Sequence, residues 1–406
     1  MPATETHIVP AIFRERTQSL GMLCSAFSMA LPDENRDVAW LNCTAKYTTP
    51  KHKVKMKLGI IGLPQSGKTT LYNALTRGNT PTTASAGRME VHTGVVEVPD
   101  PRVDKLSGMF KPKKTIYAKV TYADIAGLEG NSKGGISGTL LNTLSQMDAF
   151  INVVRCFEDD NVPHPAGSVN PGRDAEAMLT ELLLNDLIAV ERRLEKLTEE
   201  RKKGGTDKAL NERQTVLFTR LLEALNANKP LRDLEYTPDE IRELSSFGLL
   251  TRKRILTVFN LGEGQKAPTA QFDHPTVALP AKLEMEISQL APEDAQVFMA
   301  EYGIQEPALN LMIRLSYDLL GLQSFFTVGE DEVRAWTTRR NATAVESAGE
   351  IHTDIARGFV RAEVVAYEDL IELGSMAECK AKGKFRLEGK EYVVKDGDIV
   401  HIRSSI

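Results

Sequence analysis

Residues 58–75, which read LGIIGLPQSGKTTLYNAL, decide the fold class of this chain. An apolar run of four residues is followed by Gly62, four further residues, and then Gly67, Lys68 and Thr69. Glycines let the backbone curl so that successive N–H groups converge on oxyanions, and the N-terminus of the following helix adds its positive dipole end. The stretch therefore predicts a phosphate-binding loop between a strand and a helix.

Each residue of this loop has an expected role in binding a nucleoside triphosphate. The ammonium group of Lys68 should neutralise the β- and γ-phosphates, and the hydroxyl group of Thr69 should bind Mg²⁺. The predicted nucleotide-binding residues of the loop are Gly62, Gln65, Ser66, Gly67, Lys68, Thr69 and Thr70.

The composition of the chain excludes several other classes of protein. The 406 residues carry a net charge of −5, which gives no overall attraction to nucleic acid. The four cysteines lack CxxC spacing and the seven histidines form no ligand cluster, which argues against zinc sites and disulfides and for a reducing, cytoplasmic setting. The negative net charge leads us to expect no DNA partner. Because no apolar stretch reaches the ~18 residues of a membrane span, we expect no membrane partner either.

Residues 1–55 precede the position where a phosphate-binding-loop domain usually starts, close to Met56. The segment LGMLCSAFSMAL after Arg14 and Arg16 weakly imitates a signal peptide, but export would separate the domain from cytosolic nucleotide. We expect residues 1–55 to be a poorly ordered extension or the product of a mis-assigned start.

Strand signals recur through residues 56–321. Runs rich in β-branched and aromatic residues occupy positions 58–61, 93–98, 116–124, 149–156 and 254–260. Together they predict an α/β domain with a mostly parallel sheet flanked by helices.

A helical hairpin is predicted as an insertion at about residues 174–250. A four-three spacing of apolar residues, typical of a coiled-coil seam, is broken by Lys202–Asp207 and followed by a second helix over about residues 208–228. The expected arms measure roughly 30 to 40 Å at 1.5 Å per residue. Both a plain structural insertion and a partner-docking arm fit this pattern. The seam residues are Leu183, Leu187, Val190, Leu194 and Leu197.

Residues 322–406 form a separate small α+β unit in this interpretation. Strand-like runs occupy positions 359–367 and 391–403, and the sequence KDGD within the second run predicts a hairpin turn. The balance of Lys and Arg against Asp and Glu in this unit does not by itself predict RNA binding.

The sequence DIAGL at residues 124–128 follows a predicted strand and supplies the second half of a catalytic site. Asp124 is placed to hold a magnesium-bound water, and the N–H group of Gly127 is free to contact the γ-phosphate. The next residue is Leu128, which has no polar atom to orient an attacking water. We therefore expect slow turnover or another residue that positions the water.

The base pocket should lie after the predicted strand 254–260. In GTPases an Asn-Lys-x-Asp tetrad ends in a carboxylate that accepts both guanine donors, whereas this chain has Asn260, Leu261, Gly262 and Glu263. The longer carboxylate and the loss of the lysine weaken a guanine clamp, and adenine does not need one. Asn260 and Glu263 are thus predicted nucleotide-binding residues, with a turn-capping role for Asn260 as the alternative.

Taken together, residues 56–406 closely resemble the YchF/Obg-like ATPase family of the translation-factor class. The resemblance is carried by the loop, by DIAGL and NLGE, and by the longer segments VPDPRVDKL, VVRCFEDDNVPHPAGSVNP, EVRAWT, GEIHTDIARGFVRAEVVAYEDLIELGS and GKFRLEGKEYVVKDGDIVH. It implies a nucleotide-binding domain interrupted by a coiled-coil hairpin and followed by a TGS domain of β-grasp type. It further implies preference for ATP over GTP, slow hydrolysis, and association with the ribosome or ribosomal RNA.

Two positions depart from the family pattern. Where the family carries TIEPN, this chain has RMEVH at residues 88–92, so no threonine matches the one that can reach the metal. Where the family has a histidine before VVRCFE, this chain has Asn152, which binds water but takes no proton at neutral pH. Two alternatives to a ribosome-linked ATPase follow: a nucleotide-dependent binding protein that hardly hydrolyses, and a GTPase.

Overall fold

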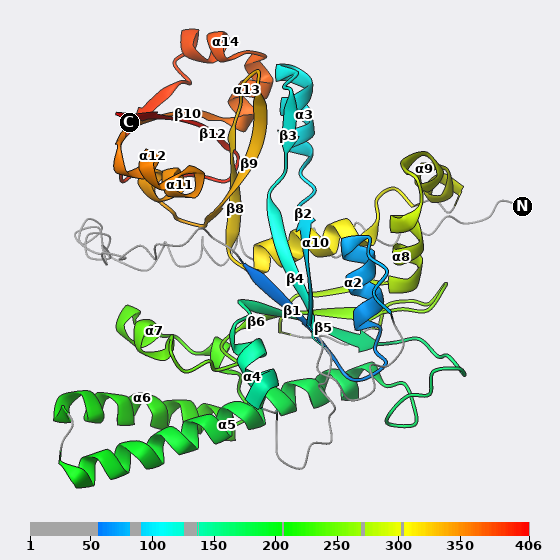
Figure 1. The fold of residues 1–406 in the computed structure, drawn as a ribbon, viewed down its shortest axis with the longest axis vertical. Coiled ribbons are helices and arrows are strands. Elements are labelled where there is room, and N and C mark those ends of the chain that lie inside the picture. Colours follow the sequence, from blue (N-terminus) through cyan, green and yellow to red (C-terminus); the bar gives the residue numbers. More distant parts are fainter. Residues whose placement is uncertain are drawn as a thin grey trace, which may run out of the picture. The chain divides into compact units, whose positions relative to one another are not determined.

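The computed structural model describes residues 56–81, 91–125, 136, 138–204, 207–268, 273–301 and 304–405. The prediction about residues 1–55 lies outside this range and stays a prediction. Within the described range the chain builds two six-stranded sheets, a helical hairpin and a set of covering helices (Figure 1).

The first sheet carries the predicted phosphate-binding loop. Its order is β2 (Val91–Glu97), β4 (Lys119–Ile125), β1 (Lys57–Ile61), β5 (Ala149–Arg155), β6 (Arg254–Asn260) and β7 (Thr276–Leu279). All neighbouring pairs are parallel except β2 with β4, so the predicted mostly parallel sheet is confirmed. Strand β7 has only four residues and was not among the predicted strands.

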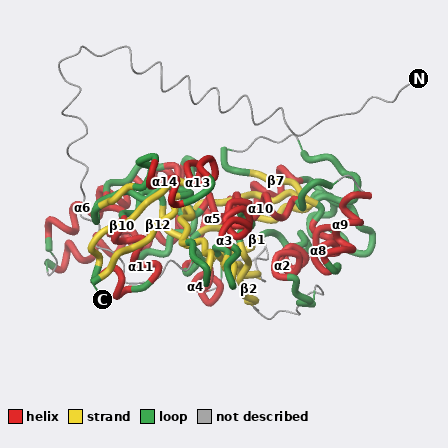
Figure 2. The backbone as a smooth tube through the Cα atoms, turned by 90° about the horizontal axis from the view of Figure 1, so that it is seen from above, coloured by secondary structure: helices red, strands yellow, loops and turns green. Residues whose placement is uncertain are grey.

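Helices cover both faces of this sheet. On one face α2 (Lys68–Thr76) lies beside α8 (Ala281–Gln289), and α10 (Ala308–Leu319) joins the same apolar core (Figures 1 and 2). On the other face α4 (Gly138–Ser145) and the first turns of α5 (Pro171–Lys203) pack over β1 and β5. Helix α9 (Pro292–Glu301) follows α8 and has no buried residue. Strands buried on both sides explain the continuous apolar runs that the sequence shows.

The predicted helical hairpin is present. Helix α5 runs into α6 (Lys208–Asn226), and the break falls at the predicted glycines, with Gly204 in the left-handed conformation and Asp207 capping α6. The two arms measure about 50 and 29 Å at 1.5 Å per residue, so the first is longer than predicted. Its extra length comes from the first turns, which begin at Pro171 and pack on the sheet.

Apolar residues join the two arms and the segment that returns to the first sheet. Val190 and Leu197 of α5 are buried in one cluster with Phe218 and Leu221 of α6. The returning segment contains a short 3₁₀ turn (Leu231–Asp233) and α7 (Pro238–Leu244), whose Leu244 belongs to the same cluster.

The second sheet is mixed. Its order is β11 (Arg386–Glu388), β10 (Phe359–Ala366), β12 (Asp398–Ser404), β8 (Leu322–Thr327), β9 (Glu332–Arg339) and β3 (Lys114–Ile116). Four short helices accompany it: α11 (Ala344–Ile351), α12 (Thr353–Arg357), α13 (Tyr367–Leu373) and α14 (Met376–Ala381). A C-terminal sheet domain is thus confirmed, and its assignment as a TGS domain stays a prediction.

One prediction about these strands is wrong. The KDGD turn does not close a hairpin, because β12 pairs with β10 and β8, and Val393 makes only an isolated bridge to Thr343. The turn is instead fixed by Asp396, which accepts a hydrogen bond from the backbone of Ser324, and by Asp398, which accepts one from the backbone of Lys395. These contacts direct the chain into the middle of the sheet.

The predicted strand at residues 116–124 is confirmed as β4 over most of its length, but its first residue, Ile116, belongs to β3 in the second sheet. β3 pairs with β9 of the second sheet, whereas β4 pairs with β1 and β2 of the first. Helix α3 (Pro101–Phe110) leads into β3 (Figure 1). Its Arg102 forms an ion pair of 2.7 Å with Asp396, which lies in the turn before β12. The strand change occurs at residues 117–118, so the C-terminal sheet contains a strand from before residue 322.

Candidate nucleotide-binding site

The loop between β1 and α2 has the backbone geometry that its glycines require. Gly62 and Gly67 have φ angles of 150° and 93°. A Cβ atom on Gly62 would lie 2.4 Å from the carbonyl oxygen of Val153, and one on Gly67 would lie 2.2 Å from Nδ2 of Asn260. Gln65 also has a positive φ, at 60°. The loop is therefore folded tightly against the ends of β5 and β6.

Lys68 begins helix α2 and turns its ammonium group back over the loop. Nζ donates to the carbonyl oxygens of Gly62 at 3.1 Å and Leu63 at 2.9 Å. Burial lowers the pKa of Lys68 to about 8, and the nearby charge of Asp124 opposes this shift. An ammonium group held in a partly desolvated site gains strongly from an anion placed beside it.

Thr69 and Asp124, which the sequence places at one metal site, lie in direct contact. Thr69 Oγ1 donates to Asp124 Oδ2 at 2.7 Å. Asp124 is at the carboxyl end of β4, opposite His92 of β2, and burial raises its pKa while Thr69, Lys68 and His92 act against that rise. Asp124 Oδ1 is buried with no hydrogen-bond partner in the part of the chain that the structure describes.

These groups fit a magnesium ion. A hydroxyl oxygen and a carboxylate with an unsatisfied oxygen are hard oxygen donors of the kind that Mg²⁺ takes from proteins. The buried Ser66 Oγ likewise lacks a partner among the described residues, so a second polar atom of the loop is unsatisfied. No group of three or more His, Cys, Asp or Glu side chains suited to a metal occurs in the described ranges, which leaves this pair as the candidate.

Asn260 connects three parts of the site. Its Nδ2 donates to the carbonyl oxygen of Ser66 at 3.0 Å, and its Oδ1 accepts from the backbone N–H of Ala281 at 3.0 Å. These bonds tie the end of β6 to the phosphate-binding loop and to the first residue of α8. The side chain thus bonds distant segments, not the turn that follows it, and its contact with a nucleotide stays a prediction.

The turn after Asn260 contains a residue that the sequence reasoning missed. Gln265 Oε1 accepts from the Gly262 N–H at 2.8 Å, and its Nε2 donates to the carbonyl oxygen of Cys156 at 2.6 Å. Glu263 lies exposed at this turn. Nothing in the sequence marks a glutamine between Gly264 and Lys266 as the link between the ends of β6 and β5.

Several predicted residues are not tested by this geometry. Gly127, Leu128 and residues 88–90 lie outside the described ranges. Thr70 occupies the third position of α2. Asn152 is buried in β5 and is the register neighbour of Ile61, the last residue of β1 before the loop.

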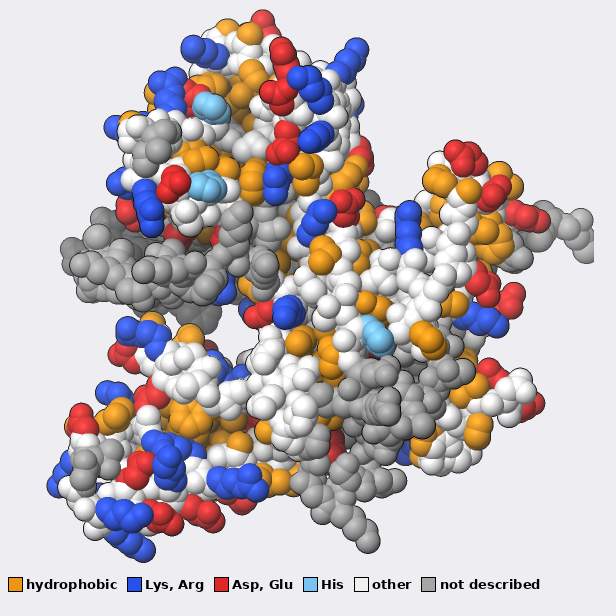
Figure 3. Space-filling model, in the orientation of Figure 1, with side chains coloured by type: hydrophobic (Ala, Val, Ile, Leu, Met, Phe, Trp, Pro, Cys, Tyr) orange, Lys and Arg blue, Asp and Glu red, His pale blue; other side chains and the backbone are white. Residues whose placement is uncertain are grey.

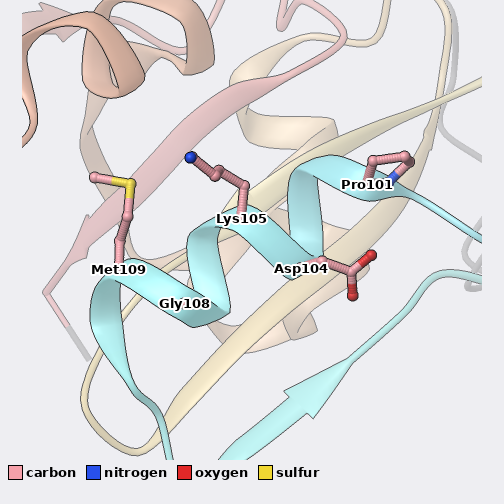
Figure 4. Close-up of a pocket in the computed structure, with 5 residues that line it drawn as sticks. All are labelled: Pro101, Asp104, Lys105, Gly108 and Met109. Atoms are coloured by element: carbon pink, nitrogen blue, oxygen red, sulfur yellow. The ribbon is translucent and has the colours of Figure 1, made fainter.

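One surface feature lies apart from this site. A shallow pocket on α3 is lined by Pro101, Asp104, Lys105, Gly108 and Met109, all from one helix and none from the loop (Figure 4). No helix in the described part of the chain combines the length and the apolar character needed to cross a membrane.

Comparison with known families matches two parts of the chain. The family model MMR_HSR1, described as "50S ribosome-binding GTPase", covers residues 57–193. The model YchF-GTPase_C, described as "Protein of unknown function (DUF933)", covers residues 322–405. The first includes the phosphate-binding loop, Asp124 and most of α5, and the second includes the C-terminal strands β8 to β12.

Similar proteins match nearly their whole length. The "Ribosome-binding ATPase YchF" of Bacillus subtilis is 41% identical over 364 residues, which is 86% of this chain and 99% of that protein. The protein of the same name from Escherichia coli O157:H7 is 40% identical over 358 residues, or 85% and 98%. The solved structure of the Schizosaccharomyces pombe YchF GTPase superposes with a TM-score of 0.74 at 30% identity, covering 86% of this chain and 98% of that one.

Proposed function

The chain belongs to the YchF family, and from this premise we propose that it is a magnesium-dependent ATPase that associates with the ribosome. The phosphate-binding loop and the named relatives support the more general statement that the chain is a nucleoside triphosphate hydrolase. The observation that carries the proposal is the convergence of Lys68, Thr69 and Asp124 at the end of β1.

The proposed binding step uses groups that the loop already orients. Backbone N–H groups of residues 65–70 and the ammonium group of Lys68 bind the phosphates, and the loop carbonyls that Lys68 now contacts give way to phosphate oxygens. Thr69 and Asp124 would hold Mg²⁺, and when bound the ion neutralises charge on the β- and γ-phosphates. In this proposal the N–H group of Gly127 contacts the γ-phosphate.

The proposed hydrolysis is slow. Leu128 follows Gly127 and cannot orient a water, and Asn152 in β5 can accept or donate a hydrogen bond but cannot act as a base at neutral pH. Without a positioned base, the remaining catalysis is electrostatic stabilisation of the phosphoryl group by Lys68 and the loop.

ATP is the proposed substrate. Glu263, the residue in the position that reads guanine in GTPases, is exposed at its turn. Leu261, in the position of the lysine that packs over the base, packs against the cluster of Val154, Cys156, Ala175 and Phe259. In this proposal neither side chain supplies the contacts by which GTPases select guanine.

The ribosome is proposed as partner because the relatives named above bear that name. The face of the hairpin seen in Figure 3 mixes Lys and Arg with Asp and Glu. We propose the hairpin and the C-terminal unit, with boundaries near residues 174–250 and 322–406, as the parts that contact the partner. This function would be exercised in the cytoplasm, where ribosomes and ATP occur.

Phosphate release tests the activity. Wild type with ATP and Mg²⁺ should release phosphate slowly, and Lys68→Ala should lose most of that release. Equal rates for the two proteins would overturn the ATPase proposal. Calorimetric titration with ATP, ADP and GTP then tests the substrate, because tighter binding of GTP by tenfold or more would make the protein a GTPase.

A nucleotide-dependent binding protein with negligible hydrolysis is the second candidate, favoured by Leu128 and Asn152. It predicts tight ATP binding that Lys68→Ala abolishes, with no phosphate release above background from either protein.

A further inference from the structure

Helix α9 forms without contributing to the core of the described chain. None of its 10 residues is buried, and its apolar residues Val297 and Met299 belong to none of the apolar clusters that the described residues form. Its neighbours α8 and α10 both supply buried residues to the core of the first sheet. Most helical stability in proteins comes from packing of an apolar face, so a short helix that buries nothing lacks its main source of stability.

One face of α9 carries an apolar residue between carboxylates. Glu293 and Asp294 precede Val297 by four and three positions, and Glu301 follows it by four, which places these side chains on one side of a helix. All four residues are exposed, Val297 to 67%. We call them the α9 face. Carboxylate and apolar side chains lie next to one another in Figure 3 where Figure 1 shows α9.

The charge around the α9 face has one sign. Residues 283–313 contain six Asp and Glu residues and no Lys, Arg or His. Two of the six have partners within the protein, because Glu284 is buried and accepts a backbone hydrogen bond from α10 at 2.9 Å, and Glu306 pairs with Arg314 at 2.6 Å. The other four, which are Glu286 and the three carboxylates of the α9 face, are exposed.

This charge decides between the classes of molecule that could cover the α9 face. Nucleic acid and anionic lipid both carry phosphates, which these carboxylates repel. The same face of a second copy of the chain would set carboxylate against carboxylate. A protein segment rich in Lys or Arg is attracted instead, and opposite charges of this kind also speed the encounter of two proteins.

We propose that the α9 face is a docking surface for a Lys- or Arg-rich segment of a protein partner. The cations of that segment pair with the three carboxylates, and one of its apolar side chains covers Val297. The partner thereby supplies the packing that α9 does not receive from the described chain. This inference goes beyond the proposed function and does not depend on nucleotide binding.

Fluorescence anisotropy at low salt tests the charge and the apolar contact in the full chain. A labelled peptide of lysine and leucine should bind wild type, whereas the same peptide with glutamate in place of lysine, and a single-stranded RNA, should not. The triple variant Glu293→Gln, Asp294→Asn, Glu301→Gln should bind the lysine peptide about tenfold more weakly, because three exposed ion pairs are lost. Val297→Ser should weaken it about threefold, because apolar surface stays in water.

Matched variants on the hairpin separate docking from general attraction to a negatively charged chain. Glu191→Gln, Glu195→Gln and Glu223→Gln together remove three exposed carboxylates from α5 and α6, and Val216→Ser changes a valine that is 73% exposed on α6. Both proteins should bind the lysine peptide as wild type does. Equal weakening by the two triple variants, or no binding by wild type, overturns the inference.

Hydrogen exchange of the α9 amides locates the contact. The lysine peptide should slow their exchange in wild type and leave it unchanged in the α9 triple variant, because a covered helix opens less often. Exchange that the peptide does not alter in wild type overturns the inference, and so does RNA binding that the α9 triple variant changes. Every variant should bind ATP as wild type does, so failure here leaves the proposed function intact.

Discussion

Thr69 and Asp124 are joined by a hydrogen bond of 2.7 Å although they lie 55 positions apart in the chain. The bond crosses from the first turn of α2 to the carboxyl end of β4, so it links the phosphate-binding loop to the strand that enters the DIAGL segment. Asp124 keeps a second, unpartnered oxygen buried among the described residues. A buried carboxylate oxygen without a partner is costly, and this supports the proposal that Thr69 and Asp124 bind Mg²⁺.

Asp124→Asn should therefore separate magnesium binding from folding. Titration of a fluorescent ATP analogue should show that Mg²⁺ tightens binding to wild type by about tenfold, equal to 1.4 kcal/mol, and has little effect on the variant. Thr69→Ala should behave like Asp124→Asn, and Thr69→Ser, which keeps the hydroxyl, should behave like wild type. Because burial raises the pKa of Asp124, removing the charge should not lower the unfolding midpoint. Unchanged magnesium dependence in both Asp124→Asn and Thr69→Ala would contradict the assignment.

Gly67→Ala should damage the loop through steric contact. The new Cβ would lie 2.2 Å from Asn260 Nδ2, at a φ of 93°, so the Asn260 bond to Ser66 has to break. We expect a loss of about 2 kcal/mol in the free energy of unfolding, from strain and from the lost bond, together with loss of ATP binding.

Gly204→Ala is the control for this substitution. Gly204 has a φ of 69° at the end of α5, and a Cβ there meets no atom within 4 Å. The substitution Gly204→Ala should lower the free energy of unfolding by about 1 kcal/mol, because alanine does not favour this backbone conformation, and should leave ATP binding as in wild type. Urea unfolding and analogue titration measure both, and equal ATP affinity in the two alanine variants would refute the steric account.

Local patterns in the sequence predicted the elements that local physics determines. The phosphate-binding loop requires glycines at fixed spacing between a strand and a helix, and strand β6 is bounded by Arg254 and Asn260 as predicted. The hairpin break follows from two adjacent glycines and the capping Asp207. In each case the residues that specify the element lie within a few positions of one another.

Contacts between residues far apart in the sequence could not be predicted in the same way. Residues 114–125 have one continuous strand-like character, and nothing in it shows that Ile116 pairs with Arg334 while Ile125 pairs with Val91. The KDGD turn failed as a hairpin because Asp396 bonds the backbone of Ser324, 72 positions away. Gln265 was missed because its role depends on the position of the Cys156 carbonyl, which the sequence does not specify.

The base of the hairpin depends on one buried carboxylate. Asp186 of α5 is fully buried and accepts from the backbone N–H groups of Leu250 at 2.8 Å and Thr251 at 2.7 Å, and from the Thr251 hydroxyl at 2.6 Å. Burial raises the pKa of Asp186, so Asp186→Asn relieves part of the cost of a buried charge. The amide, however, turns an NH₂ group toward donors that then lack an acceptor.

We expect the lost acceptor to outweigh the relieved charge, so Asp186→Asn should destabilise the protein by about 2 kcal/mol. Urea unfolding measures the change. Asp239→Asn, whose side chain is 74% exposed on α7, is the matched control and should stay within about 0.5 kcal/mol of wild type. If Asp186→Asn is as stable as Asp239→Asn, the hydrogen bonds of Asp186 make no net contribution to the free energy of unfolding.

Lys253 should make stability depend on pH in the alkaline range. Its ammonium group donates to the carbonyl oxygen of Ser145, the last residue of helix α4, at 2.7 Å, and to that of Met147, two residues further on. Burial lowers the pKa of Lys253 from 10.5 to about 8, with Asp148 and Asp186 opposing the shift and Arg252 adding to it. Between these two values the unfolded chain binds more protons than the folded protein at this residue.

The titration of Lys253 therefore raises the free energy of unfolding as the pH increases from about 8 to about 10, because over this range the unfolded chain binds more protons at this residue than the folded protein does. Lys253→Met lacks this contribution, so wild type should gain in unfolding midpoint relative to the variant when the pH is raised from about 7.5 to about 9.5. Lys208→Met, on the exposed first turn of α6, is the control and should keep a constant difference from wild type. Thermal unfolding at the two pH values measures all three proteins. If instead the unfolding midpoint of wild type falls relative to that of Lys253→Met when the pH is raised, the folded protein holds the Lys253 proton more tightly than the unfolded chain does, and the carbonyl oxygens of Ser145 and Met147 outweigh burial.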